Sequence, residues 1–196
     1  MYPLKFSIEY PAKLSRGILF LRLFFGWLYV GIPHCVVLFF LCIWLFIINF
    51  IAFWAILFTG KVPKGMFDYA VGFYRWCLRV SAYLMFMTDK YPAFSLKPVE
   101  NDSVILELDY PEKLSRGKLI LKVLFGWIYV MIPHYFCLSF VGIAADVLAF
   151  LGWWAILFKG KYPESWFHFV EGYYRWSYRV AFYFYYCDVY PPFSLK

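Results

Sequence analysis

The chain has 196 residues, of which 64% are hydrophobic, 26% are aromatic and only 16% are charged. Soluble domains usually carry about 25% charged residues, so this composition argues against a water-soluble globule. The formal net charge is +7. Because the lysines and arginines flank apolar runs, this charge favours contact with anionic lipid headgroups and argues against a nucleic-acid partner.

Several sequence motifs occur twice in the chain. Tyr10–Gly17 recurs as Tyr110–Gly117, and Trp54–Phe58 recurs as Trp154–Phe158, with only a few changed residues. Repeats are sought first because a missed repeat leads to a wrong fold. The sequence is therefore a tandem duplication with an offset of 100 residues, as from Tyr10 to Tyr110, which becomes 99 at the copy ends, as from Phe94 to Phe193.

The link between the copies is rich in turn-forming and acidic residues. Residues 98–103 read Pro-Val-Glu-Asn-Asp-Ser, a composition typical of a loop. We therefore predict repeat 1 over 1–97, an acidic linker over 98–103 and repeat 2 over 104–196, with the same organisation in both repeats.

Each copy opens with alternating apolar and polar residues, over 4–9 and 104–109. A period of two residues predicts a half-buried strand. The ends of the copies, 94–97 and 193–196, have a similar character. We expect these segments to form a small sheet outside the bilayer.

A basic, amphipathic helix is predicted next, beginning near Pro11 and Pro111. A narrow basic stripe opposite a wide apolar face suits a helix that lies in the headgroup plane. The interfacial basic residues are Lys13, Arg16, Arg22, Lys113, Arg116, Lys118 and Lys122. Pro33 and Pro133 predict a break after this helix. Alternatively, the segment forms the first turn of a spanning helix, with snorkelling lysines.

The long apolar runs at about 33–58 and 133–158 are predicted helices. Each is long enough to cross roughly 30 Å of hydrocarbon at about 1.5 Å per residue. Gly60 and Gly160 are expected to end them. The second run carries small residues at helical spacing, which would let another helix approach closely. These residues are Gly142, Ala145, Ala149 and Gly152.

A third helix of each copy, at about 66–88 and 165–187, carries two arginines four residues apart. An arginine in the middle of a span costs at least about 2.5 kcal/mol. Either these helices lie obliquely in the interface, with the guanidinium groups among lipid headgroups, or they span and the arginines are paired within the protein. The arginines are Arg75, Arg79, Arg175 and Arg179.

Asp146 is the only acidic residue in the two long apolar runs. In a helical hairpin it would lie at about the depth of Arg175, and an unpaired carboxylate there is expensive. We therefore predict an intramembrane ion pair of Asp146 with Arg175 or Arg179.

Copy one has no such acid, because Phe46 occupies the position that matches Asp146. Arg75 and Arg79 would then need Asp146 from the other copy, a lipid phosphate or a partner subunit. Arginine binds phosphate through paired hydrogen bonds, so an anionic lipid is a suitable ligand.

Two spans per copy would leave the repeats parallel, with the strands and basic helices of both copies on one side of the membrane. The similar distribution of lysine and arginine in the two copies places that side in the cytoplasm. The N-terminal residues also lack the pattern of a secretory signal.

His34 and His134 are the main candidates for chemistry, because paired histidines can hold a haem. The third histidine, His168, has Asp68 as its counterpart. The simpler interpretation is that His34 and His134 cap polar groups at the membrane boundary. No catalytic motif or metal-binding spacing is present, and the five cysteines lie in or beside apolar runs as small fillers. We expect no catalytic residue, no metal and no cofactor.

The motifs also resemble a known family. They read Tyr-Pro-Glu-Lys-Leu-Ser-Arg, Ile-Pro-His, Trp-Ala-Ile-Leu-Phe-x-Gly-Lys-x-Pro, Tyr-Arg-Trp-x-x-Arg-Val and Tyr-Pro-x-Phe-Ser-Leu. In this order they resemble the bacterial membrane family known as domain of unknown function 4389, in two copies that cover almost the whole chain. The resemblance implies an integral membrane protein and brings no established activity. The chain departs from the family pattern in its additional aromatic residues and its acidic link.

The sequence therefore predicts an all-α integral membrane protein with two tandem repeats. Each repeat has an interfacial amphipathic helix and a helical hairpin, with short β-strands outside the bilayer. We expect a multi-pass protein of the bacterial inner (cytoplasmic) membrane with cytoplasmic termini. The expected function is a non-catalytic membrane scaffold or accessory subunit that binds anionic lipid and other membrane protein subunits. The alternative is a haem-binding or other redox subunit that uses His34 and His134.

Overall fold

The computed structural model describes residues 2–196 and contains the same order of elements in both copies. Copy one consists of β1 (Leu4–Ile8), α1 (Arg16–Gly26), the π-helical turn η1 (Trp27–Gly31), α2 (Ile32–Thr59) and α3 (Lys64–Leu84). Copy two consists of β2 (Val104–Leu108), α4 (Arg116–Gly126), the π-helical turn η2 (Trp127–Met131), α5 (Ile132–Lys159) and α6 (Glu164–Tyr183). The predicted mostly helical chain with two tandem repeats is confirmed.

The two strands join the copies to each other. β1 and β2 pair antiparallel, with Leu4 opposite Leu108. In this register Phe6 lies opposite Leu106, which is its counterpart in the other copy. Because antiparallel partners run in opposite directions, this self-pairing places a pseudo-twofold axis perpendicular to the sheet, between Phe6 and Leu106.

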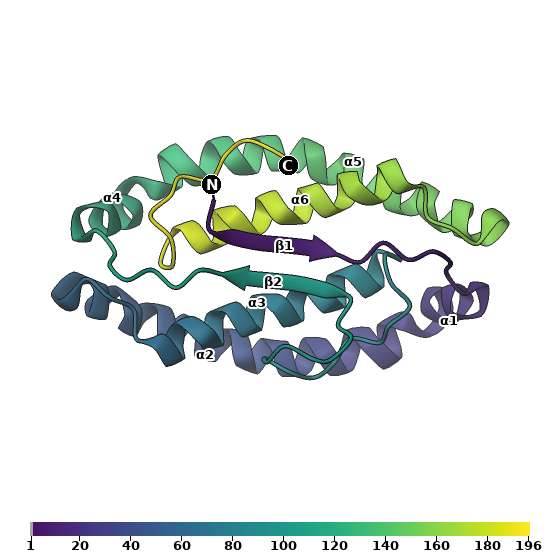
Figure 1. Cartoon of the computed structure of the whole chain (residues 1–196), viewed down its shortest axis with the longest axis horizontal. Coiled ribbons are helices and arrows are strands. Elements are labelled where there is room, and N and C mark those ends of the chain that lie inside the picture. The colour runs from purple at the N-terminus through teal and green to yellow at the C-terminus, as the bar shows by residue number, and fades with distance from the viewer. Residues whose placement is uncertain (1) are drawn as a thin grey trace.

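The copies follow this axis throughout the molecule (Figure 1). α2 and α5 run in opposite directions, and α1 and α4 lie at opposite ends of the long dimension. The prediction that the long helices of the two repeats run in the same direction is therefore wrong. The cause is the strand pairing between copies, which turns one copy by half a revolution relative to the other.

The copy ends also differ from the prediction, since residues 94–97 and 193–196 contain no strand. The reason is that their backbone carbonyls accept hydrogen bonds from arginine side chains, described below, and not from a neighbouring strand.

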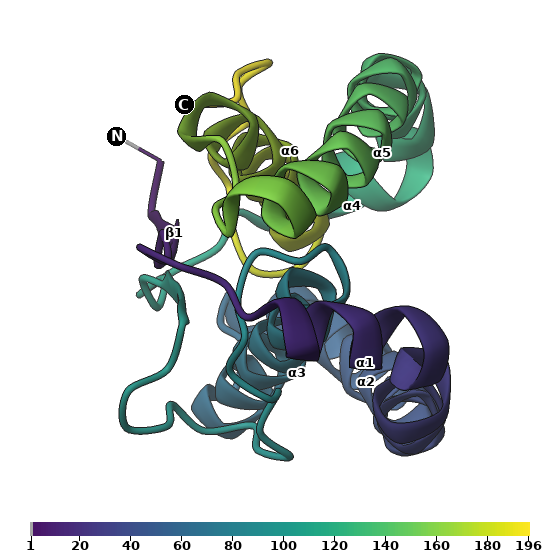
Figure 2. The ribbon, with the colours of Figure 1, turned by 90° about the vertical axis from the view of Figure 1, so that its right-hand side faces the viewer.

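The elements form three layers (Figure 2). The sheet lies on one side, α3 and α6 lie in the middle, and α2 and α5 lie on the far side, with α1 running from the middle toward α2. One stripe of α2 packs inward, with Leu45, Ile48 and Ala52 buried. The opposite face of each long helix is open, since Phe50 and Phe150 are each 61% exposed.

Helix α1 continues into α2 without a break, so that Arg16–Thr59 is one helical run. Ser15 caps its start by accepting a hydrogen bond from the backbone N–H of Ile18, as serine commonly does at this position. The predicted interruption of the helix at Pro33 does not occur, but the run changes direction near η1, since α1 lies across the view of Figure 2 and α2 runs along the line of sight. The helix also begins later than Pro11. The wider turn of η1 lies just before Pro33, which occupies the first turn of α2, and π-helical turns accommodate such irregularities.

The ends of the long helices are held by the other copy. Gly60 and Gly160 end α2 and α5 in the left-handed conformation, with φ of 74° and 69°, which glycine adopts without strain. The carbonyl of Gly160 accepts a hydrogen bond from the N–H of Leu14 at 3.0 Å, and that of Gly60 from Leu114 at 2.8 Å. Each copy therefore fixes the end of the other copy's long helix.

Candidate functional site

The arginines of α3 bind backbone carbonyls on the sheet side of the molecule. Arg75 donates from Nε and Nη2 to the Leu106 carbonyl of β2 at 3.1 and 2.9 Å, and from Nη1 to Leu96. Arg79 donates to the carbonyls of Ser95 at 2.6 Å and Lys97 at 2.9 Å. These bonds tie the end of copy one to α3 and leave neither guanidinium group free for a lipid.

Arg79 also has an acidic partner that lies outside the long helices. Its Nε lies 2.6 Å from an Asp102 carboxylate oxygen, and its side chain is only 2% exposed. The acidic linker of the sequence thus supplies the charge that neutralises a buried arginine.

The arginines of α6 likewise bind the carbonyls at the end of copy two. Arg175 donates to the Leu195 carbonyl at 2.8 Å and lies 3.2 Å from the Glu171 carboxylate. Arg179 donates to the carbonyls of Ser194 and Lys196. Glu171 also accepts a hydrogen bond from the N–H of Ile8 at 3.0 Å, and so connects α6 to β1.

The predicted ion pair of Asp146 with Arg175 or Arg179 is not formed. Among residues 2–196, Asp146 takes part in no ion pair, and its side chain is exposed on α5. The pair was predicted from the similar depths of Asp146 and Arg175 in a helical hairpin. Similar depth does not bring them together, because α6 turns its arginines toward the sheet, away from α5.

The stripe of small residues on α5 is filled by the chain itself. A side-chain carbon added at Gly152 would lie 2.6 Å from the ring of Tyr162, and one at Gly142 would lie 3.3 Å from the ring of Tyr173. Ala145 is buried as well. The small residues of α5 were predicted to let another helix approach closely. In the structure the groups that approach them are the rings of Tyr162 and Tyr173, which belong to the same copy.

Two of the predicted interfacial basic residues are buried. Arg22 donates to the Tyr83 carbonyl at 2.6 Å and forms an ion pair with Asp89. Lys122 lies 2.6 Å from a carboxylate oxygen of Asp188. The prediction that these two side chains contact headgroups is wrong, because each is covered by the segment that follows the last helix of its own copy. This segment, which we call the tail, covers residues 85–97 in copy one and 184–196 in copy two.

Asp89 and Asp188 have a second role at the helix starts. The other carboxylate oxygen of Asp89 accepts a hydrogen bond from the N–H of Ser15, and that of Asp188 from Ser115, each at 2.6 Å. Carboxylates are favourable at helix N-termini, where backbone N–H groups lack partners. Both acids were missed from the sequence, although they occupy matching positions near the ends of the copies.

The remaining predicted basic residues are exposed at the two ends of the molecule. They are Lys13, Arg16, Lys113, Arg116 and Lys118. Arg116 donates to the Phe58 carbonyl at the end of α2, and Arg16 donates to Phe158 at the end of α5. Among the described residues neither arginine has a carboxylate partner.

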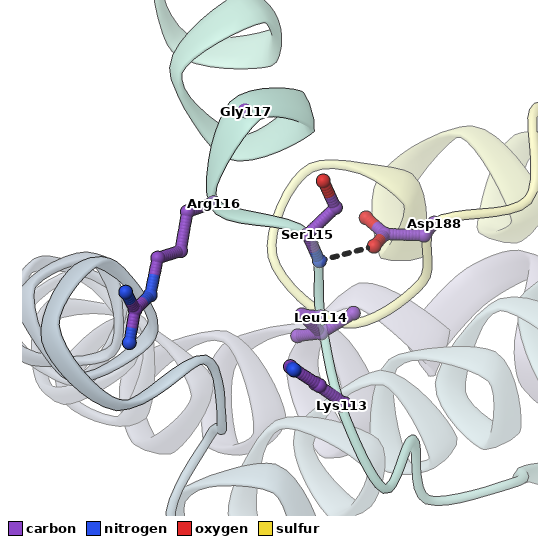
Figure 3. Close-up of a pocket in the computed structure, with 6 residues that line it drawn as sticks. All are labelled: Lys113, Leu114, Ser115, Arg116, Gly117 and Asp188. Atoms are coloured by element: carbon purple, nitrogen blue, oxygen red, sulfur yellow. Dashed lines mark hydrogen bonds between the residues drawn. The ribbon is translucent and has the colours of Figure 1, made fainter.

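At the copy-two end these residues line a shallow depression of about 620 Å³. Figure 3 shows Arg116 directed away from Asp188 and Lys113 on the chain just before the helix. Asp188 is neutralised by Lys122 beneath it. The positive charges of Lys113 and Arg116 are therefore uncompensated, and they suit an anionic group.

His34 and His134 are buried separately. Each lies in the first turn of its long helix, and α2 and α5 begin at opposite ends of the molecule (Figure 1). Nδ1 of His34 accepts a hydrogen bond from Trp76 Nε1 at 2.9 Å, and Nδ1 of His134 accepts one from Trp176 at 2.8 Å. The structure therefore does not bring the two rings together around one haem.

The outer faces of the long helices form a large apolar surface. The helical runs Arg16–Thr59 and Arg116–Lys159 are each long and apolar enough to cross a membrane. Their most apolar windows are only 17% and 22% buried, whereas a core helix of a soluble protein is mostly covered. Large exposed apolar surfaces mark sites of contact with a membrane or with another protein.

The family described as Domain of unknown function (DUF4389) matches residues 18–95 and 121–194. The matches lie one in each copy, as the sequence motifs predicted. Neither a curated protein nor a solved structure matches the chain.

Proposed function

We propose that this chain, which belongs to the family described as Domain of unknown function (DUF4389) and contains it twice, is a non-catalytic membrane scaffold that binds anionic lipid. The observation that carries the proposal is the exposed apolar surface of α2 and α5, bordered at both ends by basic side chains that have no acidic partner within residues 2–196. Apolar area favours the acyl chains, and each basic residue near an anionic surface adds about 1 kcal/mol.

The proposed location is the inner membrane of a bacterium, with the sheet and both termini toward the cytoplasm. The first described residues and the C-terminal end lie on the side of the molecule that carries the sheet (Figure 2). The exposed lysines and arginines at the helix ends agree with the excess of basic residues on the cytoplasmic side of membrane proteins.

An accessory role in a larger membrane complex is the second part of the proposal. The filled stripe on α5 gives it no support, so the available surface for a protein partner is the polar sheet side, with Lys5, Glu107 and the linker at 98–103. Cross-linking in membranes before gentle extraction tests this part, and recovery of uncross-linked monomer alone would argue against it.

The lipid part is tested by extracting the protein in a mild detergent and measuring the phospholipids that co-purify. The variant Lys13→Gln/Lys113→Gln should lose anionic lipid on the order of fivefold per residue. The matched control is Lys5→Gln/Lys97→Gln, which removes two exposed charges elsewhere and should retain the lipid. Equal lipid retention in all three proteins would contradict the proposal.

A further inference from the structure

We infer that the protein lies in one leaflet of the membrane, with α2 and α5 parallel to the membrane plane, the sheet in water and the pseudo-twofold axis along the membrane normal. This inference rests on the proposed function and specifies how the apolar surface meets the lipid. It replaces the multi-pass arrangement expected from the lengths of the apolar runs.

The position of the sheet argues against spanning helices. β1 and β2 run beside the middle of the long helices, and the three layers are stacked across the helix direction (Figures 1 and 2). If α2 and α5 crossed the bilayer, the sheet would lie at its midplane. A two-stranded sheet has two open edges, and open sheet edges facing lipid do not occur in the hydrocarbon region.

The charges of the sheet lead to the same conclusion. Lys5 and Glu107 lie beside the pseudo-twofold axis, and their side chains are 69% and 54% exposed. At the midplane of a bilayer both would face hydrocarbon, which costs several kcal/mol for each charge. In the in-plane orientation both face water.

Asp146 distinguishes the two orientations in the same way. It lies at the centre of α5, which runs over Ile132–Lys159, and would therefore lie at the midplane if α5 spanned. It directly follows the buried Ala145 on the helix, so successive residues at 100° intervals place it on the flank of α5 and not on its outermost face. A flank position is shallow when the helix lies in the membrane plane.

The pseudo-twofold axis makes the in-plane orientation consistent for both copies. A rotation about the membrane normal leaves the depth of every residue unchanged. Lys13 and Lys113, at opposite ends of the molecule, then lie at the same depth on the same side of the membrane. The open faces of α2 and α5, which both point away from the sheet, enter the leaflet together (Figure 2).

The outer layer has the composition of a helix surface immersed in acyl chains. The exposed apolar side chains of α2 include Phe39, Phe40, Trp44, Phe46, Phe50 and Trp54. α5 carries a similar set, which includes Phe136, Phe140, Ile143, Phe150, Trp154 and Phe158. Aromatic side chains are favoured at the boundary between headgroups and acyl chains, and helices that lie there bury their apolar face by about 5–10 Å.

Polarised infrared spectroscopy of the wild-type protein in oriented bilayers tests this orientation directly. All long helices run along one dimension of the molecule, so the helix axes should be found parallel to the membrane plane. Helix axes along the membrane normal would overturn the inference and leave the lipid-binding proposal intact. A protein that does not associate with the bilayers at all would overturn both.

A cysteine-labelling experiment tests the sidedness. Single cysteines are introduced by Lys13→Cys, Lys113→Cys and Glu107→Cys in a background without the natural cysteines, and are reacted with a membrane-impermeant maleimide in inverted and right-side-out vesicles. We expect all three positions to react from the same side. Labelling of positions 13 and 113 from opposite sides, with position 107 protected, would overturn the inference.

A fourth substitution, Ile43→Cys, reports on what covers the apolar face. It should be protected in vesicles and become reactive when the lipid is replaced by a short-chain detergent. Protection in both conditions, with a dimer in sedimentation analysis, would show that a second copy of the chain covers the face and would overturn the inference.

Discussion

The hydroxyl group of Tyr91 donates a hydrogen bond to the backbone carbonyl of Tyr29, with an O···O distance of 3.0 Å. Tyr29 lies four residues before Pro33, which has no N–H to donate to that carbonyl in a regular helix. Copy two contains the same bond, from Tyr190 to Tyr129, at 2.9 Å. The tyrosines at the copy ends thus supply donors that the prolines remove, and the helical run continues.

Removal of this donor should destabilise the protein. The change Tyr91→Phe leaves the Tyr29 carbonyl without its donor, and we expect the free energy of unfolding in detergent micelles to fall by about 1 kcal/mol. In a Pro33→Ala background the backbone N–H at position 33 can serve the carbonyl, so Tyr91→Phe should cost less. An equal cost in both backgrounds would show that Tyr91 does not compensate for the proline.

Glycine is required where the tail of each copy crosses its last helix. A methyl group at Gly72 would collide with the Leu96 carbonyl oxygen, and one at Gly172 would lie 2.7 Å from that of Leu195. We expect Gly72→Ala to displace the tail at 94–97 and to increase the rate of limited proteolysis there.

Gly65 provides the matched control, because among residues 2–196 no atom outside the local helix backbone and the two chain neighbours lies within 4 Å of a side-chain carbon added at this position. Gly65→Ala should leave the protein unchanged or stabilise it by up to about 1 kcal/mol, as alanine favours the helix. Equal effects of the two substitutions would contradict the close crossing at Gly72.

Loss of the Arg79 side chain should be costly. Arg79→Met leaves Asp102 and two tail carbonyls without their donor, and removal of one member of a buried ion pair costs about 3–5 kcal/mol. Chemical denaturation measures this loss. The exposed pair of Lys5 with Glu107 serves as the control, since Lys5→Met should change the stability by less than about 1 kcal/mol. A loss for Arg79→Met as small as that of the control would refute the role of Arg79 as an anchor of the tail.

The acids beneath the helix starts should also be needed for stability. Asp89→Asn removes the charge that neutralises the buried Arg22, so we expect a lower unfolding temperature and increased proteolysis of the segment that precedes α1. Asp188→Asn should act in the same way through Lys122 in copy two. As a control, Glu112→Gln removes an exposed carboxylate near the start of α4 and should have little effect. If both aspartate variants behaved like this control, the ion pairs would contribute nothing measurable.

Most of the helical architecture could be predicted from the sequence. The apolar runs ended by Gly60 and Gly160 are so distinct that the predicted long helices differ from α2 and α5 by about one residue at each end. The strands at the start of each copy were recognisable from their alternation. The family was recognisable from the order of the motifs, because both copies carry them.

The orientation of one copy relative to the other could not be predicted from the sequence. Whether Phe6 pairs with Leu106 or with a tail segment depends on contacts between residues far apart in the chain, and alternation is the same in both cases. The predicted contact between Asp146 and Arg175 was based only on their similar depth in a helical hairpin. Whether an arginine side chain points toward the neighbouring helix also depends on how its own helix is rotated about its axis. Asp89 and Tyr91 could have been noticed, since matched polar residues recur in both copies.

The hydrogen bonds between the copies have a consequence for chains that contain only one. A single copy would present an unpaired strand edge and a long helix whose terminal carbonyl, at the position of Gly60, has lost the N–H that Leu114 supplies. A second identical chain offers both partners in the same register, because Phe6 already faces its own counterpart. A one-copy relative of this protein should therefore be a symmetric homodimer, and the fusion of two copies makes that assembly independent of concentration.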